Sequence, residues 1–134
     1  MADEAILAKG SVALVTGASA GIGRAVATGL SARGARVICA ARRLDRLEDL
    51  VAGLPSPALA FELDIADGEA VDGLLQRLPE DWRQIDILVN NAGHDLGGRQ
   101  PFHQRDAADV AAVIETNVTG MIRTTLAIVP GMRE

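Results

Sequence analysis

The residues best suited to bind a ligand form a glycine-rich stretch near the start of the chain, Thr16-Gly17-Ala18-Ser19-Ala20-Gly21-Ile22-Gly23. Gly17 permits a tight turn, and Gly21 lets the backbone approach a pyrophosphate without a Cβ in the way. Gly23 lets the following helix pack closely on the preceding strand. The N-terminus of that helix offers unpaired N–H groups and the positive end of its dipole to an anion. The stretch therefore predicts a phosphate-binding turn.

An alternative interpretation is that these glycines only mark a tight turn between a strand and a helix. Their spacing also departs from the G-x-G-x-x-G fingerprint of dinucleotide-binding turns. The stretch nevertheless occupies the first strand-to-helix turn of a chain in which strands and helices alternate. That position favours the nucleotide-binding interpretation.

The end of the second apolar run indicates which dinucleotide would bind. The run Val37–Ala41 ends without an acidic residue, and Arg42 and Arg43 follow directly. An acid at this position binds the ribose 2′-OH of NAD, whereas an arginine suits the 2′-phosphate of NADP. The sequence therefore favours NADP(H) over NAD(H), unless these arginines are ordinary solvated charges before a helix. Asp45 is the nearest acid, but its position suits a helix cap better.

Apolar runs and helical patterns alternate along the chain and would position these residues. The predicted strands are Val12–Thr16, Val37–Ala41, Ala58–Leu63 and Ile85–Val89. The predicted helices are Gly23–Ala32, Leu44–Leu54, Asp67–Leu78 with Asp67 as its N-cap, and Ala107–Val129, which Pro130-Gly131 ends; Asn90–Arg105 is a predicted loop. Such alternation implies parallel pairing with helices on both faces. The predicted fold class is α/β, an incomplete Rossmann-type doubly wound sheet with about four strands in the order 3-2-1-4.

Composition narrows the class of protein. With 134 residues, 49% of them apolar and 23% charged, residues 1–134 are predicted to form one globular domain. The net charge of −5 argues against nucleic acid as a partner. No run approaches about 20 apolar residues, so no membrane span is expected. Since the acidic start Met1–Glu4 lacks a secretory n-region, and Cys39 is the single cysteine, a cytoplasmic location is expected.

Four motifs in this chain together resemble the short-chain dehydrogenase/reductase family. They are the Gly17–Gly23 turn, Asp64-Ile65 after the third strand, Asn90-Asn91-Ala92-Gly93 after the fourth, and Asn117 in the last helix. The resemblance extends from about Lys9 to Met132 and implies NADP(H)-dependent hydride transfer between a small alcohol and a carbonyl compound. The arginine pair and the Gly93–Gln100 segment resemble the branch that acts on small hydroxy acids.

The resemblance also implies a role for each matching residue. Asp64 and Ile65 would flank the adenine, and Asn117 would hold a water in a proton relay. Asp64 could instead be a turn or cap residue and Asn90 a simple turn residue, but an Asn inside a helix is unfavourable and favours a specific role for Asn117. The implied cofactor-binding residues are Gly17, Ser19, Gly21, Ile22, Gly23, Arg42, Arg43, Asp64, Ile65, Asn90, Ala92 and Gly93. His94 and His103 lack a third ligand at a recognisable spacing, so no metal site is predicted.

The residues that transfer the proton in this family are absent from the chain. The family uses a Ser and a Tyr-x-x-x-Lys pair, but the chain has no Tyr, and its only Lys is Lys9. The chain is therefore expected to be one partial dinucleotide-binding domain, inactive alone, with the catalytic half supplied by a complementing C-terminal segment or cut away. The alternatives are a non-catalytic NADP(H)-binding module and a scaffold that assembles through its last helix. A homo-oligomer is expected.

Overall fold

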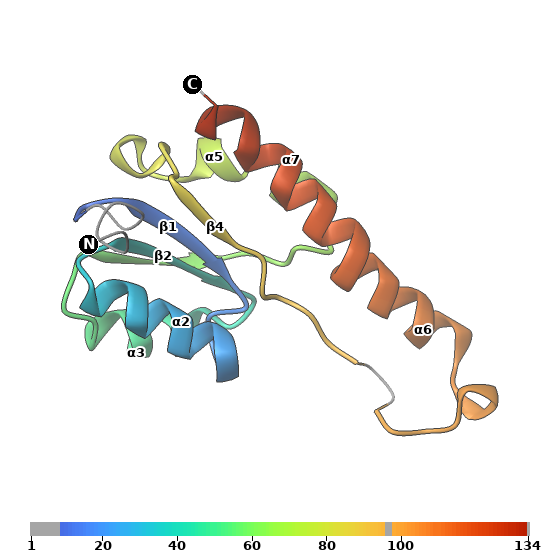
Figure 1. Ribbon diagram of the computed structural model, residues 1–134. Coiled ribbons are helices and arrows are strands. Elements are labelled where there is room, and N and C mark those ends of the chain that lie inside the picture. Colours follow the sequence, from blue (N-terminus) through green and yellow to red (C-terminus); the bar gives the residue numbers. More distant parts are fainter. Residues whose placement is uncertain (1–8, 96–97, 134) are drawn as a thin grey trace.

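The computed structural model describes residues 9–95 and 98–133, which form a parallel sheet with helices on both faces (Figure 1). The acidic start Met1–Glu4 and residues 96–97 of the Gly93–Gln100 segment lie outside the described residues.

The strands of the sheet are all parallel and lie in the order β3-β2-β1-β4, which confirms the predicted order. They are β1 (Val12–Thr16), β2 (Arg36–Ala41), β3 (Ala58–Glu62) and β4 (Ile87–Val89). Thr16 at the end of β1 lies opposite Ala40 of β2, and Val15 lies opposite Val89 of β4. The carboxyl ends of these three strands are therefore neighbours.

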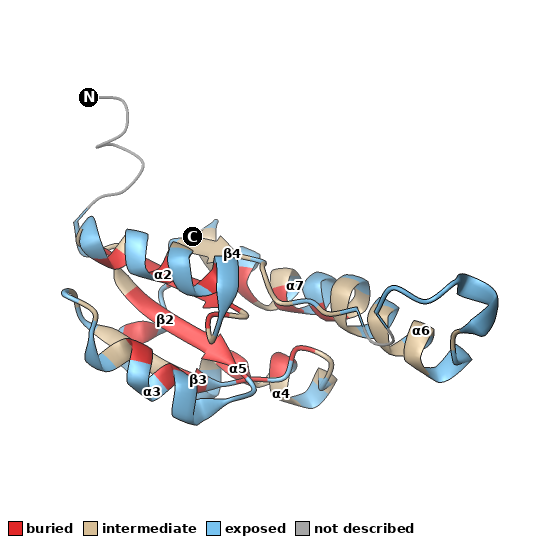
Figure 2. Ribbon diagram, turned by 90° about the horizontal axis from the view of Figure 1, so that it is seen from below, coloured by how far each residue is buried: buried red, intermediate tan, exposed pale blue. Residues whose placement is uncertain are grey.

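Helices cover both faces of the sheet. They are α2 (Gly21–Ala32), α3 (Leu44–Ala52), α4 (Gly68–Asp72), α5 (Leu74–Arg77), α6 (Ala107–Ile114) and α7 (Met121–Met132), with 3-10 turns at η1 (Glu80–Trp82) and η2 (Phe102–Gln104). Helices α2 and α3 lie on one face, and α5 and α7 lie on the other (Figure 1). The end of the long helix at α6 extends beyond the sheet, and α6 has no buried residue (Figure 2).

Two apolar cores, one on each face, hold these layers together. Because successive strand residues point to opposite faces, Leu14 packs with Val71, Leu74 and other residues of one core, whereas Val15 packs with Leu47 in the other. Every residue of β1 is buried, as expected for a central parallel strand.

Two predicted elements are shorter or broken. The helix predicted over Asp67–Leu78 is divided at Gly73, which lies between α4 and α5 and is a poor helix former. Asp67 is its N-cap as predicted, since its side chain accepts the N–H of Ala70. The fourth strand begins at Ile87 rather than Ile85. The Asp86 carboxylate accepts the N–H of Val12 at 2.9 Å, so this N–H is not paired with the backbone of β4.

Three predicted helix boundaries are also wrong. Helix α2 begins at Gly21 rather than Gly23, and the residue at the N-cap of α3 is Arg43 rather than Asp45. Asp45 lies in the first turn of α3, where its negative charge interacts favourably with the positive end of the helix dipole. Pro130 does not end the last helix, which continues to Met132. A proline near a C-terminus sacrifices one backbone bond, and the packing of Met132 on the core offsets this cost.

The long helix predicted over Ala107–Val129 is interrupted. Between α6 and α7 the backbone forms a π-helical segment, η3 (Glu115–Gly120). Such segments are rare and insert an extra residue into a helix, frequently at functional sites. Asn117 lies within this segment.

Candidate functional site

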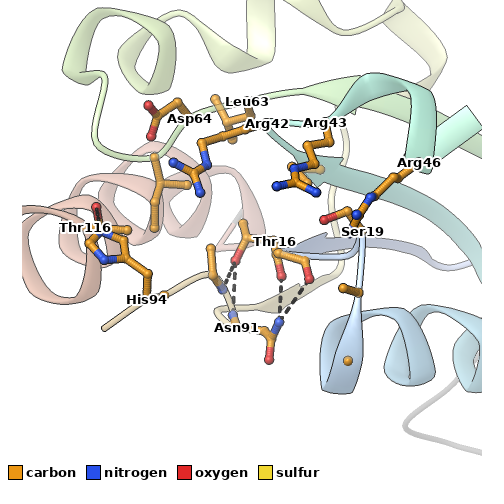
Figure 3. Close-up of a pocket in the computed structure, with 18 residues that line it drawn as sticks. Thr16, Ser19, Arg42, Arg43, Arg46, Leu63, Asp64, Asn91, His94 and Thr116 are labelled. Atoms are coloured by element: carbon orange, nitrogen blue, oxygen red, sulfur yellow. Dashed lines mark hydrogen bonds between the residues drawn. The ribbon is translucent and has the colours of Figure 1, made fainter. Parts of the chain in front are cut away.

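A cavity of about 400 Å³ lies beyond the carboxyl ends of β1, β2 and β4 (Figure 3). Its position is the one where the strand order reverses, because β2 and β4 lie on opposite sides of β1. Ligands of open α/β sheets bind at this kind of switch point. The predicted site residues that line the cavity are Gly17, Ser19, Gly21, Arg42, Arg43, Asp64, Ile65, Ala92 and Gly93.

The other predicted residues lie beside the cavity. The side chain of Ile22 is 75% exposed to solvent, and Gly23 lies beneath the turn. The side-chain amide of Asn90 is directed to α7, where it donates to the hydroxyl of Thr125 at 3.0 Å. Its neighbour Asn91 lines the cavity instead. The sequence motif therefore identified the segment but not which Asn faces the cavity.

Gly21 and Gly23 contribute to the turn in different ways. Gly21 lines the cavity with φ of +56°, and a Cβ built on it would meet no atom within 4 Å. The backbone at Gly21 is therefore open to a ligand. A Cβ on Gly23 would instead overlap the carbonyl oxygen of Gly17, so only glycine allows α2 to approach the turn this closely.

Thr16 and Asn91 join the glycine-rich turn to the end of β4. The buried Thr16 hydroxyl donates to the carbonyl of Val89 at 3.3 Å and accepts the N–H groups of Asn91 and Ala92, both at 3.0 Å (Figure 3). The Asn91 side-chain amide donates to the carbonyls of Thr16 and Gly17 at 3.2 and 3.3 Å. These bonds fix the cavity floor. The sequence assigned no role to Thr16, although a polar residue that ends an apolar strand is a usable signal.

One end of the cavity is strongly basic. Arg42, Arg43 and Arg46 all line it, and no ion pair in the described part of the chain involves their guanidinium groups. In Figure 3, Arg43 and Arg46 extend toward Ser19, whereas Arg42 extends toward Asp64. The sequence identified the arginine pair but not Arg46.

Among the described residues that line the cavity, Asp64 is the one acid. Its Oδ1 accepts the N–H of Ala66 at 3.0 Å, which is the local turn role that the sequence left open as an alternative. The same side chain still lies at the cavity (Figure 3). The turn role and the ligand-facing position are therefore compatible.

The wall opposite the basic end is formed by His94 and Thr116. Asn117 is not in the wall but holds it in place, since Oδ1 accepts the N–H of His94 and Nδ2 donates to the His94 carbonyl, both at 2.9 Å. His94 Nε2 lies 3.0 Å from the Thr116 hydroxyl. The π-helical segment is thus hydrogen-bonded to the loop after β4 at His94.

The thiol of Cys39 does not belong to this site. Cys39 lies in β2 within the core below α2 and α3, and burial raises the pKa of its thiol from 9.0 to about 11. A protonated, buried thiol is a poor nucleophile. Among residues 9–95 and 98–133, no cluster of three or more His, Cys, Asp or Glu side chains is arranged to hold a metal ion. No helix in these ranges is long and apolar enough to cross a membrane.

Residues 11–134 match the family model of the short chain dehydrogenases. The chain belongs to this family. The resemblance drawn from the four motifs is therefore confirmed, together with the Rossmann-type parallel sheet.

Relatives of this short-chain dehydrogenase chain include NADP-dependent enzymes. An NADP-dependent 3-hydroxy acid dehydrogenase, YdfG of Salmonella typhi, is 41% identical over 123 residues, which are 92% of this chain and 49% of that protein. The chain spans about half the length of this relative and of a probable NADP-dependent dehydrogenase of Haemophilus influenzae, which is 41% identical.

Solved structures with the same fold extend this comparison. Serine dehydrogenase of Escherichia coli matches with a TM-score of 0.83 and 39% identity, covering 90% of this chain and 56% of that one. L-sorbose reductase of Gluconobacter frateurii, solved with NADPH and L-sorbose, matches with a TM-score of 0.84 and 32% identity. That match covers 93% of this chain and 48% of the reductase.

Proposed function

We propose that this chain is the cofactor-binding part of an NADP(H)-dependent oxidoreductase that interconverts a small alcohol and a carbonyl compound. The observation that carries the proposal is that one cavity, at the switch point of the sheet, combines the open glycine turn with three arginines and has no acid at the end of β2. The names of the relatives, and the NADPH bound to L-sorbose reductase, support this cofactor.

The cavity fits the parts of a dinucleotide in order. The turn at Gly17 and Gly21 receives the pyrophosphate, because the backbone at Gly21 is open and the N-terminus of α2 offers free N–H groups. Asp64 and Ile65 border the adenine. Ala92 and Gly93 border the ribose and the middle of the cofactor, and we assign Asn91 to this wall in place of Asn90. When bound, the nicotinamide accepts or donates the hydride.

The basic end of the cavity receives the 2′-phosphate. Arg42 and Arg43 follow β2 directly, where an acidic residue would repel a phosphate dianion. A guanidinium group can bind such an anion with two parallel hydrogen bonds.

The residues of this chain do not complete the proton transfer. Reduction of a carbonyl needs a proton donor with a matched pKa, and the chain has no Tyr. Lys9 precedes β1, and the five residues of that strand place about 16 Å between it and the cavity. We therefore propose that a complementing C-terminal segment supplies a Ser and a Tyr-x-x-x-Lys pair, that Asn117 belongs to the proton relay, and that residues 1–134 alone are inactive.

Two features support a larger natural assembly. The chain spans about half the length of the NADP-dependent 3-hydroxy acid dehydrogenase YdfG of Salmonella typhi. Large apolar side chains along the last helical stretch are also exposed, including Ile114 at 54%, Ile122 at 49% and Leu126 at 68%. Such a row is typical of a surface that packs against protein. We propose that the complementing segment and a second copy of the protein cover it, and sedimentation of the natural protein tests the homo-oligomer.

The second candidate is a non-catalytic NADP(H)-binding module, which the missing Tyr favours. Fluorescence titration with NADPH and NADH, followed by assays of the natural protein with small hydroxy acids and alcohols, separates the two. We expect tighter binding of NADPH and turnover. Binding without turnover of any alcohol or carbonyl supports the module, and equal affinity for both cofactors contradicts the assignment to NADP(H).

The arginine pair provides the matching site test. Arg42→Ala should weaken the binding of NADPH more than that of NADH. An equal loss for both cofactors would show that Arg42 does not contact the 2′-phosphate.

A further inference from the structure

We infer that Arg46 is a third phosphate-binding arginine and a determinant of NADP(H) selectivity, closing the basic end of the cavity opposite Ser19. This inference rests on the proposed function. Arg46 belongs to helix α3 and not to the strand-to-helix segment that carries the arginine pair. Its role therefore depends on the way α3 is placed beside the cavity.

The position of α3 explains why Arg46 reaches the cavity. The helix begins at Leu44, so Arg46 lies in its first turn, beside the end of β2. Leu47 and Leu50 are buried against the sheet and fix the rotation of the helix. Residues three apart are neighbours on a helix surface, so Arg43 at the N-cap and Arg46 project from the same side. Both arginines line the cavity, and Figure 3 shows them extending toward Ser19.

The charges at this end of the cavity are not balanced by the protein. The chain as a whole has a net charge of −5, yet the cavity wall formed by residues 9–95 and 98–133 contains three arginines and a single acid, Asp64. In Figure 3, Asp64 lies beside Arg42 and away from Arg46. Like charges held together raise the energy of the free protein, which a bound dianion would lower.

Ser19 completes the arrangement from the other side of the cavity. It belongs to the glycine-rich turn and lines the same cavity, and in the view of Figure 3 its side chain lies next to the ends of Arg43 and Arg46. A hydroxyl donor on one side and two guanidinium groups on the other can surround the oxygens of one phosphate monoester. The ligand chemistry that this end selects is therefore a phosphate on the 2′ position of the adenosine ribose.

The test compares how matched variants of the natural protein bind nucleotides with and without a 2′-phosphate. Arg46→Gln removes the charge, and Arg46→Lys keeps the charge but loses the fork geometry. Arg33→Gln is the control, since Arg33 is exposed at the end of α2, outside the cavity wall, and its loss changes the net charge equally. Affinities are measured for NADPH, NADH, adenosine 2′,5′-bisphosphate and adenosine 5′-phosphate, and thermal unfolding verifies that each variant is folded.

We expect Arg46→Gln to lower the affinity for NADPH and for adenosine 2′,5′-bisphosphate by about tenfold. The affinities for NADH and adenosine 5′-phosphate should change little. Arg46→Lys should recover part of this loss, and Arg33→Gln should behave as the parent. The parent's affinity for NADPH should also fall more steeply with salt than that of Arg46→Gln. If the parent binds NADPH but Arg46→Gln keeps the same preference over NADH, the role of Arg46 is wrong and the proposed function stands. If the parent binds neither nucleotide, the proposed function itself fails.

Discussion

The side chain of Asn117 is bound to the backbone of His94 by two hydrogen bonds. Asn117 Oδ1 accepts the His94 N–H and Asn117 Nδ2 donates to the His94 carbonyl, each at 2.9 Å. Asn117 lies in the π-helical segment η3, and His94 forms part of the cavity wall. The irregular turn of the long helix therefore positions the loop that follows β4.

Replacing Asn117 should loosen that loop. Asn117→Leu removes both bonds and leaves the His94 backbone groups without their partner, which should lower the free energy of unfolding by about 1–3 kcal/mol. Chemical denaturation measures the loss, and NADPH titration should show weaker binding. Asn117→Asp keeps the acceptor but places a carboxylate oxygen, which cannot donate, against the His94 carbonyl, so it should also be less stable than the parent. Equal stability of all three proteins would show that the two hydrogen bonds between Asn117 and His94 do not stabilise the fold.

Substitutions at two glycines of the turn should have different effects, one mainly on stability and the other mainly on NADPH binding. Gly23→Ala places a Cβ against the Gly17 carbonyl and should destabilise the fold by about 1–3 kcal/mol. Gly21→Ala meets no atom, so its cost in stability is only that of a positive φ, about 1–2 kcal/mol, but its methyl group enters the cavity and should weaken NADPH binding.

Gly29→Ala is the matched control for both glycines. Gly29 lies inside α2, and a Cβ there would meet no atom within 4 Å, so alanine should stabilise the helix by about 0.5–1 kcal/mol and leave NADPH binding unchanged. Thermal unfolding and titration of the three variants measure both effects. Unchanged binding by folded Gly21→Ala would argue against the pyrophosphate position.

The buried thiol of Cys39 should make stability depend on alkaline pH. Burial raises the pKa of Cys39 to about 11, against 9.0 for the ordinary thiol, so above pH 9.0 the unfolded chain loses this proton before the folded protein does. The stabilisation is complete below pH 9.0 and is lost as pH rises toward about 11. The free energy of unfolding should therefore fall more steeply in the parent than in Cys39→Ala. Parallel slopes for the two proteins would exclude a contribution from this thiol.

Local signals account for what could be predicted of the fold. Short apolar runs alternating with helical patterns predicted the parallel sheet, and the Rossmann-type pattern predicted its strand order. Several of their predicted boundaries differ from those of the structure. The break at Gly73 follows the poor helix propensity of that one residue, whereas the continuation of the last helix through Pro130 accompanies the packing of Met132 on the core.

The amino-acid sequence by itself determined the family, the glycine-rich turn and the basic segment after β2, since these depend on residue types close together in the chain. Only the tertiary structure decided that Asn91 rather than Asn90 faces the cavity, that Thr16 links β1 to β4, and that Arg46 reaches the basic end. These relationships join residues of different elements. Side-chain direction at such points is set by the rotation and register of whole helices and strands, which no short stretch of sequence specifies.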